Sequence, residues 1–263
     1  MKIAVSGKGG VGKTTVSAAL VNYFSRRGEG VYAVDADPDA SLGITLGIDP
    51  NLIAEQVPLI EMKEVIENKN AGGGALVDLN PDIEDVLDEY SLTMDKVSFL
   101  RMGGVKQGGS ACYCKENSFL QSLLNSLLID KEEVVVLDMS AGIEHLTRGT
   151  SRGVDLMLVV TEPSLTSVRT SLLVDKLATE LSVKNIYFVG NKIRGAEEVT
   201  FLKDALPPNK LLGILPFDEK VMCLARGRGD DEEMLENELF EEMNQIMEKL
   251  IGGEGKTVKP TNE

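Results

Sequence analysis

The 263-residue chain contains no tryptophan, a single histidine and three cysteines, and only 5% of its residues are aromatic. One histidine cannot form a histidine cluster, and three cysteines are too few for the disulfide framework of a small secreted protein. The scarcity of aromatic rings leaves little surface for stacking on nucleic-acid bases. No apolar run approaches the roughly 20 residues that a membrane-spanning helix needs.

Positive charge is also scarce, with 27 Lys and Arg residues against 42 Asp and Glu residues and a formal net charge of −15. An acidic surface repels the phosphate backbone of nucleic acids. The first residues already belong to a predicted strand, which leaves no room for a signal peptide. We therefore expect a cytoplasmic protein that binds neither nucleic acid nor membranes.

Residues 7–15, with the sequence GKGGVGKTT, carry the clearest motif of the chain. They match the phosphate-loop pattern G-x-x-x-x-G-K-[ST], and the matching residues are Gly7, Gly12, Lys13 and Thr14. An apolar run before the motif predicts a buried strand, and apolar residues at helical spacing after it predict a helix. A phosphate-binding loop requires this order of strand, loop and helix.

The glycines of this motif have no Cβ, so successive backbone N–H groups can turn inward around a phosphate group. The N-terminal end of the following helix adds a partial positive charge. We expect Lys13 to reach the β- and γ-phosphates and the Thr14 hydroxyl to ligate Mg²⁺. The predicted nucleotide-binding residues of the loop are Gly7, Lys8, Gly9, Gly10, Val11, Gly12, Lys13, Thr14 and Thr15.

Further apolar segments alternate with helical patterns along the chain and predict buried parallel strands. These segments are residues 31–34, 97–102, 134–138, 155–161 and 186–190. The alternation indicates an α/β fold with a doubly wound, mostly parallel sheet flanked by helices. We expect a single domain over residues 1–251, which ends in an acidic amphipathic helix over residues 230–251 that packs on the sheet. The polar tail, residues 252–263, is expected to be disordered.

Two predicted strands lead into acidic residues, and open α/β sheets bind ligands at the edge where such strands end. Asp138 ends one of these strands, and we expect it to act on Mg²⁺ or on its bound waters. The other strand leads into Asp35, Asp37 and Asp39. Asp37 is favoured as a catalytic residue because in-line hydrolysis needs an oriented water. Carboxylates after a strand also serve in turns and helix caps, so the roles of Asp35 and Asp39 stay open.

Cys112 and Cys114 form a Cys-x-Cys pair just before a predicted helix. A helix N-terminus favours the thiolate, which is the form that binds metals. A closed site needs four ligands, and a twofold dimer would supply four thiolates from two copies of the pair. Zn²⁺, Cu(I), an Fe–S cluster and, less typically, Ni²⁺ suit such ligands, whereas inert thiols or a redox pair are the alternatives. For His145, a local hydrogen-bonding role is favoured over catalysis.

With Lys8 included, the loop reads K-G-G-x-G-K-[ST] and resembles the deviant Walker A motif of the MinD/ParA/nitrogenase-iron-protein class of ATPases. The resemblance implies a nucleotide-sandwich homodimer in which Lys8 crosses the interface to the other protomer's nucleotide. It also implies that Asp37 lies in switch I and positions or activates the attacking water. Asn191 matches the residue that reads the adenine ring in this class, and a loop at residues 215–217, including Pro216, is expected to flank the base.

Residues 34–41, 108–115 and 138–149 resemble, more specifically, the CooC-type maturation ATPases of nickel carbon monoxide dehydrogenase. The resemblance implies that Mg²⁺-dependent hydrolysis of ATP to ADP drives insertion of nickel into the active-site cluster of the dehydrogenase apoprotein. The implied catalytic residues are Lys8, Lys13, Asp37 and Asp138. Ni²⁺ or Zn²⁺ would bind to Cys112 and Cys114 at a four-cysteine site shared across the homodimer.

Three other functions compete with this one. A nitrogenase-iron-protein-like reductase that holds an Fe–S cluster would need a cysteine in switch II, where this sequence has Ala141. A ParA/MinD-type positioning ATPase would act on DNA or on membranes, and both the net charge and the acidic C-terminal helix argue against it. A metal-storage or metal-transfer protein would bind metal without ATP turnover, and a phosphate-release assay distinguishes it.

Overall fold

The computed structural model describes residues 1–37, 41–59, 61, 87, 90–102, 133–141, 150–224 and 238–252. Its strands are β1 (Lys2–Gly7), β2 (Val31–Ala36), β3 (Leu92–Met94), β4 (Val97–Arg101), β5 (Val134–Met139), β6 (Leu156–Thr161), β7 (Ile186–Ile193) and β8 (Leu211–Pro216). Its α-helices are α1 (Lys13–Arg26), α2 (Ser41–Thr45), α3 (Pro50–Glu55), α7 (Leu165–Glu180), α8 (Ala196–Ala205), α9 (Glu219–Leu224) and α11 (Glu238–Gly252), and a 3₁₀ turn, η2, spans Thr150–Gly153.

The strands form one eight-stranded sheet in the order β3-β4-β2-β5-β1-β6-β7-β8. The neighbouring pairs are parallel except for β3 and β4, which are antiparallel. Strands β2 to β5 lie on one side of β1 and strands β6 to β8 lie on the other, so the sheet is doubly wound. The fold class predicted from the sequence is confirmed.

The central strands explain the apolar runs of the sequence. Every residue of β1, β2, β5 and β6 is buried, because helices cover both faces of a parallel sheet. Since these strands are parallel, their carboxyl ends meet at one edge of the sheet. At that edge the loop after β1 lies near two acidic residues, and the strand register places Asp35 opposite Asp138.

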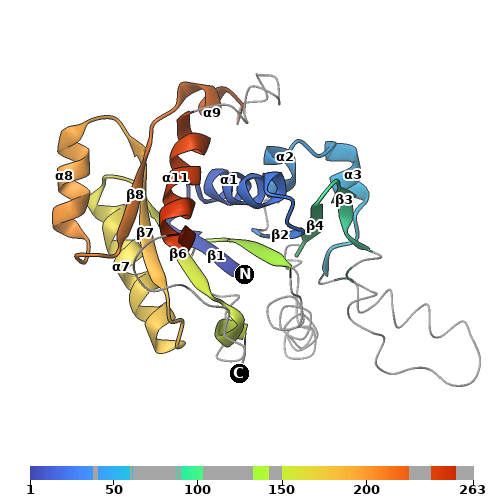
Figure 1. Ribbon diagram of the computed structural model, residues 1–263, viewed down its shortest axis with the longest axis horizontal. Coiled ribbons are helices and arrows are strands. Elements are labelled where there is room, and N and C mark those ends of the chain that lie inside the picture. Colours follow the sequence, from blue (N-terminus) through green and yellow to red (C-terminus); the bar gives the residue numbers. More distant parts are fainter. Residues whose placement is uncertain are drawn as a thin grey trace, which may run out of the picture.

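Helices lie on both faces of the sheet, as Figure 1 shows. Helices α1 and α11 share one apolar core with Ile3 and Val5 of β1. Helices α7 and α8 share the opposite core with Ala4 of the same strand. Successive residues of a strand point to opposite faces, so β1 contributes to both cores and holds the loop that follows it between them. No helix in the described part of the chain is long and apolar enough to cross a membrane.

Some local predictions differ from the structure. The predicted loop at residues 215–217 is wrong in its first two residues, because Leu215 and Pro216 belong to β8 and Leu215 is fully buried. The strand predicted over residues 186–190 continues to Ile193. The three-residue β3 was not predicted, since so short a segment shows no usable periodicity.

The C-terminal helix packs as expected, against β8 and α1. Its described part begins at Glu238, and residues 225–237 lie outside the described residues. Gly252 ends this helix, so the predicted tail does not begin there; residues 253–263 lie outside the described residues.

Candidate nucleotide-binding site

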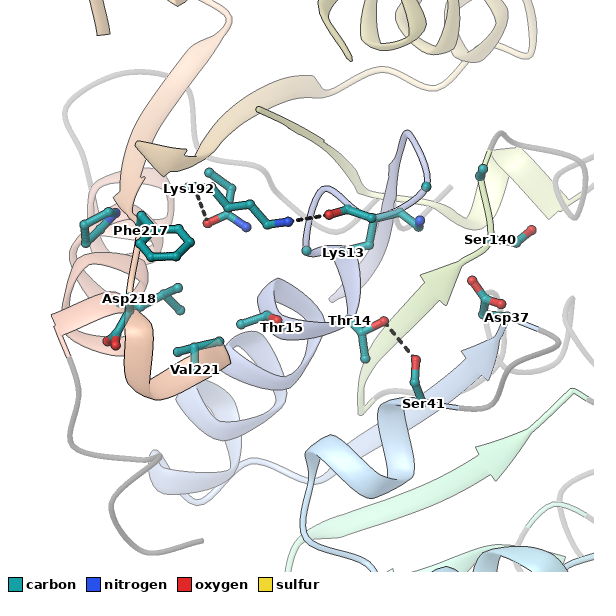
Figure 2. Close-up of a pocket in the computed structure, with 17 residues that line it drawn as sticks. Lys13, Thr14, Thr15, Asp37, Ser41, Ser140, Lys192, Phe217, Asp218 and Val221 are labelled. Atoms are coloured by element: carbon teal, nitrogen blue, oxygen red, sulfur yellow. Dashed lines mark hydrogen bonds between the residues drawn. The ribbon is translucent and has the colours of Figure 1, made fainter. Parts of the chain in front are cut away.

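A cavity of about 540 Å³ lies beside the loop that joins β1 to α1. Small-molecule sites typically have volumes of about 300–1,000 Å³. Six residues of the predicted phosphate loop line it: Gly9, Gly10, Gly12, Lys13, Thr14 and Thr15. Figure 2 shows that side chains from other elements, including Asp37 and Phe217, surround the same space. The structure therefore brings together loop residues and strand ends that are far apart in the sequence.

The loop comes so close to other backbone and side-chain atoms that two of its glycines cannot be replaced. A Cβ on Gly7, whose φ is +150°, would lie 2.3 Å from the carbonyl oxygen of Val160. A Cβ on Gly12, whose φ is +95°, would lie 2.3 Å from Nδ2 of Asn191. Both positions combine a positive φ with a close approach, so they require glycine.

Lys13 and Thr14 open α1 at the edge of the cavity. The Lys13 side chain is only 7% exposed, and its ammonium donates a hydrogen bond to the carbonyl oxygen of Lys8 at 3.4 Å. The Thr14 hydroxyl lies 3.3 Å from the hydroxyl of Ser41, the first residue of α2. Ser41 also lines the cavity, and the sequence pattern alone did not identify it as a site residue.

Asp138, at the end of β5, is fully buried and bonded to α1. The Ser17 hydroxyl donates to Oδ1 at 2.9 Å, whereas Oδ2 has no hydrogen-bond partner among the described residues. Burial raises the pKa of Asp138 to about 6, an effect that the nearby Thr14 and Ser17 hydroxyls partly offset. The Thr14 hydroxyl lies within hydrogen-bond distance of the Ser41 hydroxyl, and no hydrogen bond joins it to Oδ2 of Asp138.

An open, buried carboxylate oxygen is costly unless a donor or a cation satisfies it. The free Asp138 oxygen and the Thr14 hydroxyl are hard oxygen ligands of the kind that Mg²⁺ takes. Together with the glycine loop, they fit a Mg²⁺–nucleotide.

Asp35 is also fully buried, and it lies opposite Asp138 on the neighbouring strand β2. Its carboxylate accepts hydrogen bonds from the backbone N–H groups of Leu42 at 2.7 Å and Asp37 at 3.1 Å. Burial raises the pKa of Asp35 to about 7, although these two donors lower it. The turn-and-cap role therefore applies to Asp35, which holds the backbone on both sides of residues 38–40. Asp37 itself lines the cavity, and Asp39 lies outside the described residues.

Asn191 and Pro216 lie at the end of the cavity formed by β7 and β8. The Asn191 side chain is 3% exposed, and its Nδ2 donates to the carbonyl oxygen of Val11 at 2.8 Å. Asn191 thus holds the phosphate loop from β7. Phe217 follows β8 and lines the cavity, and the guanidinium of Arg194 lies 3.9 Å from the centre of its ring.

Lys8 is not among the residues that line the cavity. Cys112, Cys114 and His145 lie outside the described residues. Among the residues that are described, no group of three or more His, Cys, Asp or Glu side chains could hold a metal ion.

The sequence model of the CobQ/CobB/MinD/ParA nucleotide binding domain matches residues 2–229. The chain belongs to this family. It is a P-loop ATPase, as the phosphate loop and the cavity beside it indicate.

The chain is also similar to individual proteins. An uncharacterized ATP-binding protein of Methanocaldococcus jannaschii is 37% identical over 229 residues, which cover 84% of this chain and 87% of the relative. The carbon monoxide dehydrogenase accessory protein CooC of Rhodospirillum rubrum is 36% identical over 226 residues, which cover 85% and 86%. The solved structure of the MinD cell division protein of Aquifex aeolicus has a TM-score of 0.67 at 19% identity and covers 97% of this chain and 98% of its own. That likeness shows the fold.

Proposed function

We propose that this ATPase is a nickel metallochaperone, which hydrolyses ATP as a homodimer and inserts nickel into the active-site cluster of carbon monoxide dehydrogenase. The observation that carries the proposal is the 36% identity to the accessory protein CooC. Identity to an uncharacterized ATP-binding protein is equally high, so a second, chemical reason is needed. Cys112 and Cys114 supply it, because a pair of soft thiolates is suited to binding a transition metal.

The nucleotide chemistry is assigned to residues around the cavity. Backbone N–H groups of residues 7–15 and the Lys13 ammonium hold the phosphates. Thr14 and Asp138 hold Mg²⁺, which neutralises charge on the phosphates when bound. Asp37 orients the water for in-line attack, and its place on the cavity wall supports this role.

The base is assigned to the end of the cavity where Asn191 and Pro216 lie. Both residues line it, and Asn191 keeps one N–H and one acceptor lone pair beyond the hydrogen bonds it makes to Val11 and Lys192. The domain proposed for this chemistry covers residues 1–251, and the single sheet that holds all the described strands supports this extent.

The metal-transfer chemistry is assigned to the dimer. Two copies of Cys112 and Cys114 supply the four thiolates of a closed site, and Lys8 of each protomer serves the nucleotide of the other. Nickel is the cargo of this site. Zn²⁺ would compete for the same ligands, so delivery to the dehydrogenase is the property that defines the function.

The test is activation of nickel-free carbon monoxide dehydrogenase by the purified protein with Ni²⁺ and MgATP. The wild type should activate the enzyme, whereas Cys112→Ala and Cys114→Ala should not, although both keep ATPase activity. Cys223→Ala is the matched control, because it removes the third cysteine of the chain, and it should activate as the wild type does. Full activation by both variants of the Cys-x-Cys pair would refute the proposal.

A further inference from the structure

Lys192 lies inside β7 with a backbone conformation that strand residues rarely adopt. Its φ is 61°, in the left-handed region, which is disfavoured for a residue with a Cβ. The register of β7 against β8 shifts between Gly190 and Ile193, so the strand is irregular at this point. In the described part of the chain, the other non-glycine residues with positive φ lie in turns: Asp95, Ser182 and Asn209.

This conformation brings the Lys192 side chain to the phosphate loop. Its ammonium donates a hydrogen bond to the carbonyl oxygen of Gly10 at 2.5 Å. Its backbone N–H donates to Oδ1 of Asn191 at 2.9 Å, which orients the neighbouring amide. Lys192 and Gly10 both line the cavity, and Figure 2 shows the lysine side chain extending toward the loop.

Two consecutive carbonyl groups of the loop are therefore held by two consecutive residues of β7. Lys192 binds the carbonyl oxygen of Gly10, and Asn191 binds that of Val11 at 2.8 Å. A trans peptide is planar, so fixing its carbonyl oxygen also fixes the N–H on the opposite side. The Val11 N–H, on the peptide that Lys192 holds, donates to the carbonyl oxygen of Lys8 at 3.4 Å and closes a turn of the loop. The Gly12 N–H, on the peptide that Asn191 holds, is fixed in direction by that contact.

Gly10, like Gly9 before it, has open space where a side chain would lie. Its φ is +78°, and a Cβ built there would meet no atom within 4 Å. Side-chain packing therefore does not hold this turn, and its backbone hydrogen bond, from the Val11 N–H to the Lys8 carbonyl, is long at 3.4 Å. The hydrogen bond from Lys192 acts where steric contacts do not.

The stability of the fold does not explain why Lys192 adopts a disfavoured backbone conformation and contacts the loop. The hydrogen bond from Lys192 lies in an exposed setting, where a charged contact contributes little to stability. A disfavoured backbone conformation persists where the surrounding structure holds it, and such residues cluster at ligand sites. The strain at Lys192 thus points to the cavity.

We propose that Lys192 is a positioning residue for nucleotide binding, whose ammonium holds the Gly10 carbonyl and so fixes the turn of the phosphate loop between Lys8 and Val11. This inference rests on the proposed nucleotide site. Lys192 acts on the shape of the loop before chemistry begins, so its loss weakens binding of substrate and transition state alike. Such a loss raises KM and leaves kcat nearly unchanged.

The experiment compares Lys192→Gly, Lys192→Met and Lys192→Arg with the wild type. Calorimetry measures the Kd of MgADP, phosphate release measures KM and kcat, and urea unfolding is followed without nucleotide. Ser182→Gly is the matched control, because Ser182 has a φ of 69° in the turn after α7. It should unfold at a higher urea concentration than the wild type and bind MgADP as the wild type does.

Lys192→Met and Lys192→Gly should raise the Kd and KM by on the order of tenfold, as expected for the loss of one hydrogen bond from a charged group, with kcat changed less than about twofold. Lys192→Gly should also unfold at a higher urea concentration, since it removes the strain. Lys192→Arg should recover part of the affinity. Opposite changes in stability and affinity are not expected of a structural residue.

Wild-type affinity in Lys192→Gly would overturn the inference. The inference would also be overturned if Lys192→Met lowered the free energy of unfolding enough to explain its weaker binding of MgADP. Failure of the wild type to bind MgADP would instead refute the nucleotide site itself.

Discussion

The ammonium of Lys8 lies 3.9 Å from the carboxylate of Glu162 in the same chain. Glu162 directly follows β6, and its carboxylate also accepts a weak hydrogen bond from the hydroxyl of Ser164, the residue that caps α7. Lys8 is the residue proposed to cross to the other protomer. An ion pair between partly exposed side chains is weak. In the proposed dimer, the phosphates of the nucleotide bound to the other protomer therefore replace Glu162 as the partner of Lys8.

The first prediction concerns this ion pair. Glu162→Gln should free Lys8 and increase the ATP-bound dimer, by at most about fivefold in the dimerisation constant, because a pair of this kind contributes up to about 1 kcal/mol. Sedimentation at several protein concentrations with saturating ATP measures the effect. Lys8→Ala is the control and should form less dimer than the wild type. A weaker dimer in Glu162→Gln would show that Glu162 itself contributes to the interface.

The second prediction concerns Lys13. Lys13→Ala removes a nearly buried ammonium from the wall of the cavity, and with it the main positive side chain for the phosphates. ATP turnover should fall to background in a phosphate-release assay. Lys220→Ala, in the exposed part of α9, is a matched control and should hydrolyse ATP normally. Undiminished turnover in Lys13→Ala would contradict the assignment of the phosphate loop.

The third prediction separates binding from hydrolysis. Asp37→Asn keeps the size of the side chain but removes the charge that orients water. It should bind MgADP with wild-type affinity and hydrolyse ATP on the order of 10²-fold more slowly, the usual effect of losing a positioned base. Asp49→Asn alters the N-cap of α3 to another good cap and should leave the rate unchanged. Equal rates in the wild type and Asp37→Asn would exclude the catalytic role.

The fourth prediction is a pH dependence of stability in protein free of nucleotide and Mg²⁺. Burial raises the pKa of Asp35 from 3.8 to about 7, so the folded state holds this proton more tightly than the unfolded state. The resulting stabilisation is complete below pH 3.8 and is lost as the pH rises through about 7.

In Asp35→Asn, the side chain at position 35 is an amide, which takes up no proton in this pH range. Compared with this variant, the wild type should therefore lose stability as the pH rises from about 4 to about 7. Urea unfolding at several pH values measures the difference in free energy of unfolding. A difference that does not change with pH would show that the carboxylate is ionised in the folded state throughout this range.

The fifth prediction is the metal stoichiometry. If Cys112 and Cys114 of two protomers share one site, equilibrium dialysis should find one Ni²⁺ per dimer. Cys112→Ala and Cys114→Ala should each lose this binding and retain the unfolding midpoint of the wild type, whereas Cys223→Ala should keep it. Tight binding of one ion per monomer would rule out a shared site.

The phosphate loop and the parallel sheet were predictable from the sequence. The motif at residues 7–15 depends on local backbone requirements, since a glycine is needed wherever φ is positive and atoms approach closely. Buried parallel strands appear as continuous apolar runs, because helices cover both of their faces. Lys13 and Thr14 line the cavity because they follow the loop directly, and Asp37 joins them because parallel strands end at one edge of the sheet.

Only the tertiary structure decided which distant groups meet in the site. The contacts of Asn191 and Lys192 with the loop join residues 180 and 182 positions apart, and no periodicity in the sequence specifies such a pair. The hydrogen bonds of Asp35 and the meeting of Thr14 with Ser41 likewise depend on how α2 packs beside the sheet edge. Sequence patterns report which face of an element is buried, whereas strand order and register determine which side chains come within hydrogen-bond distance.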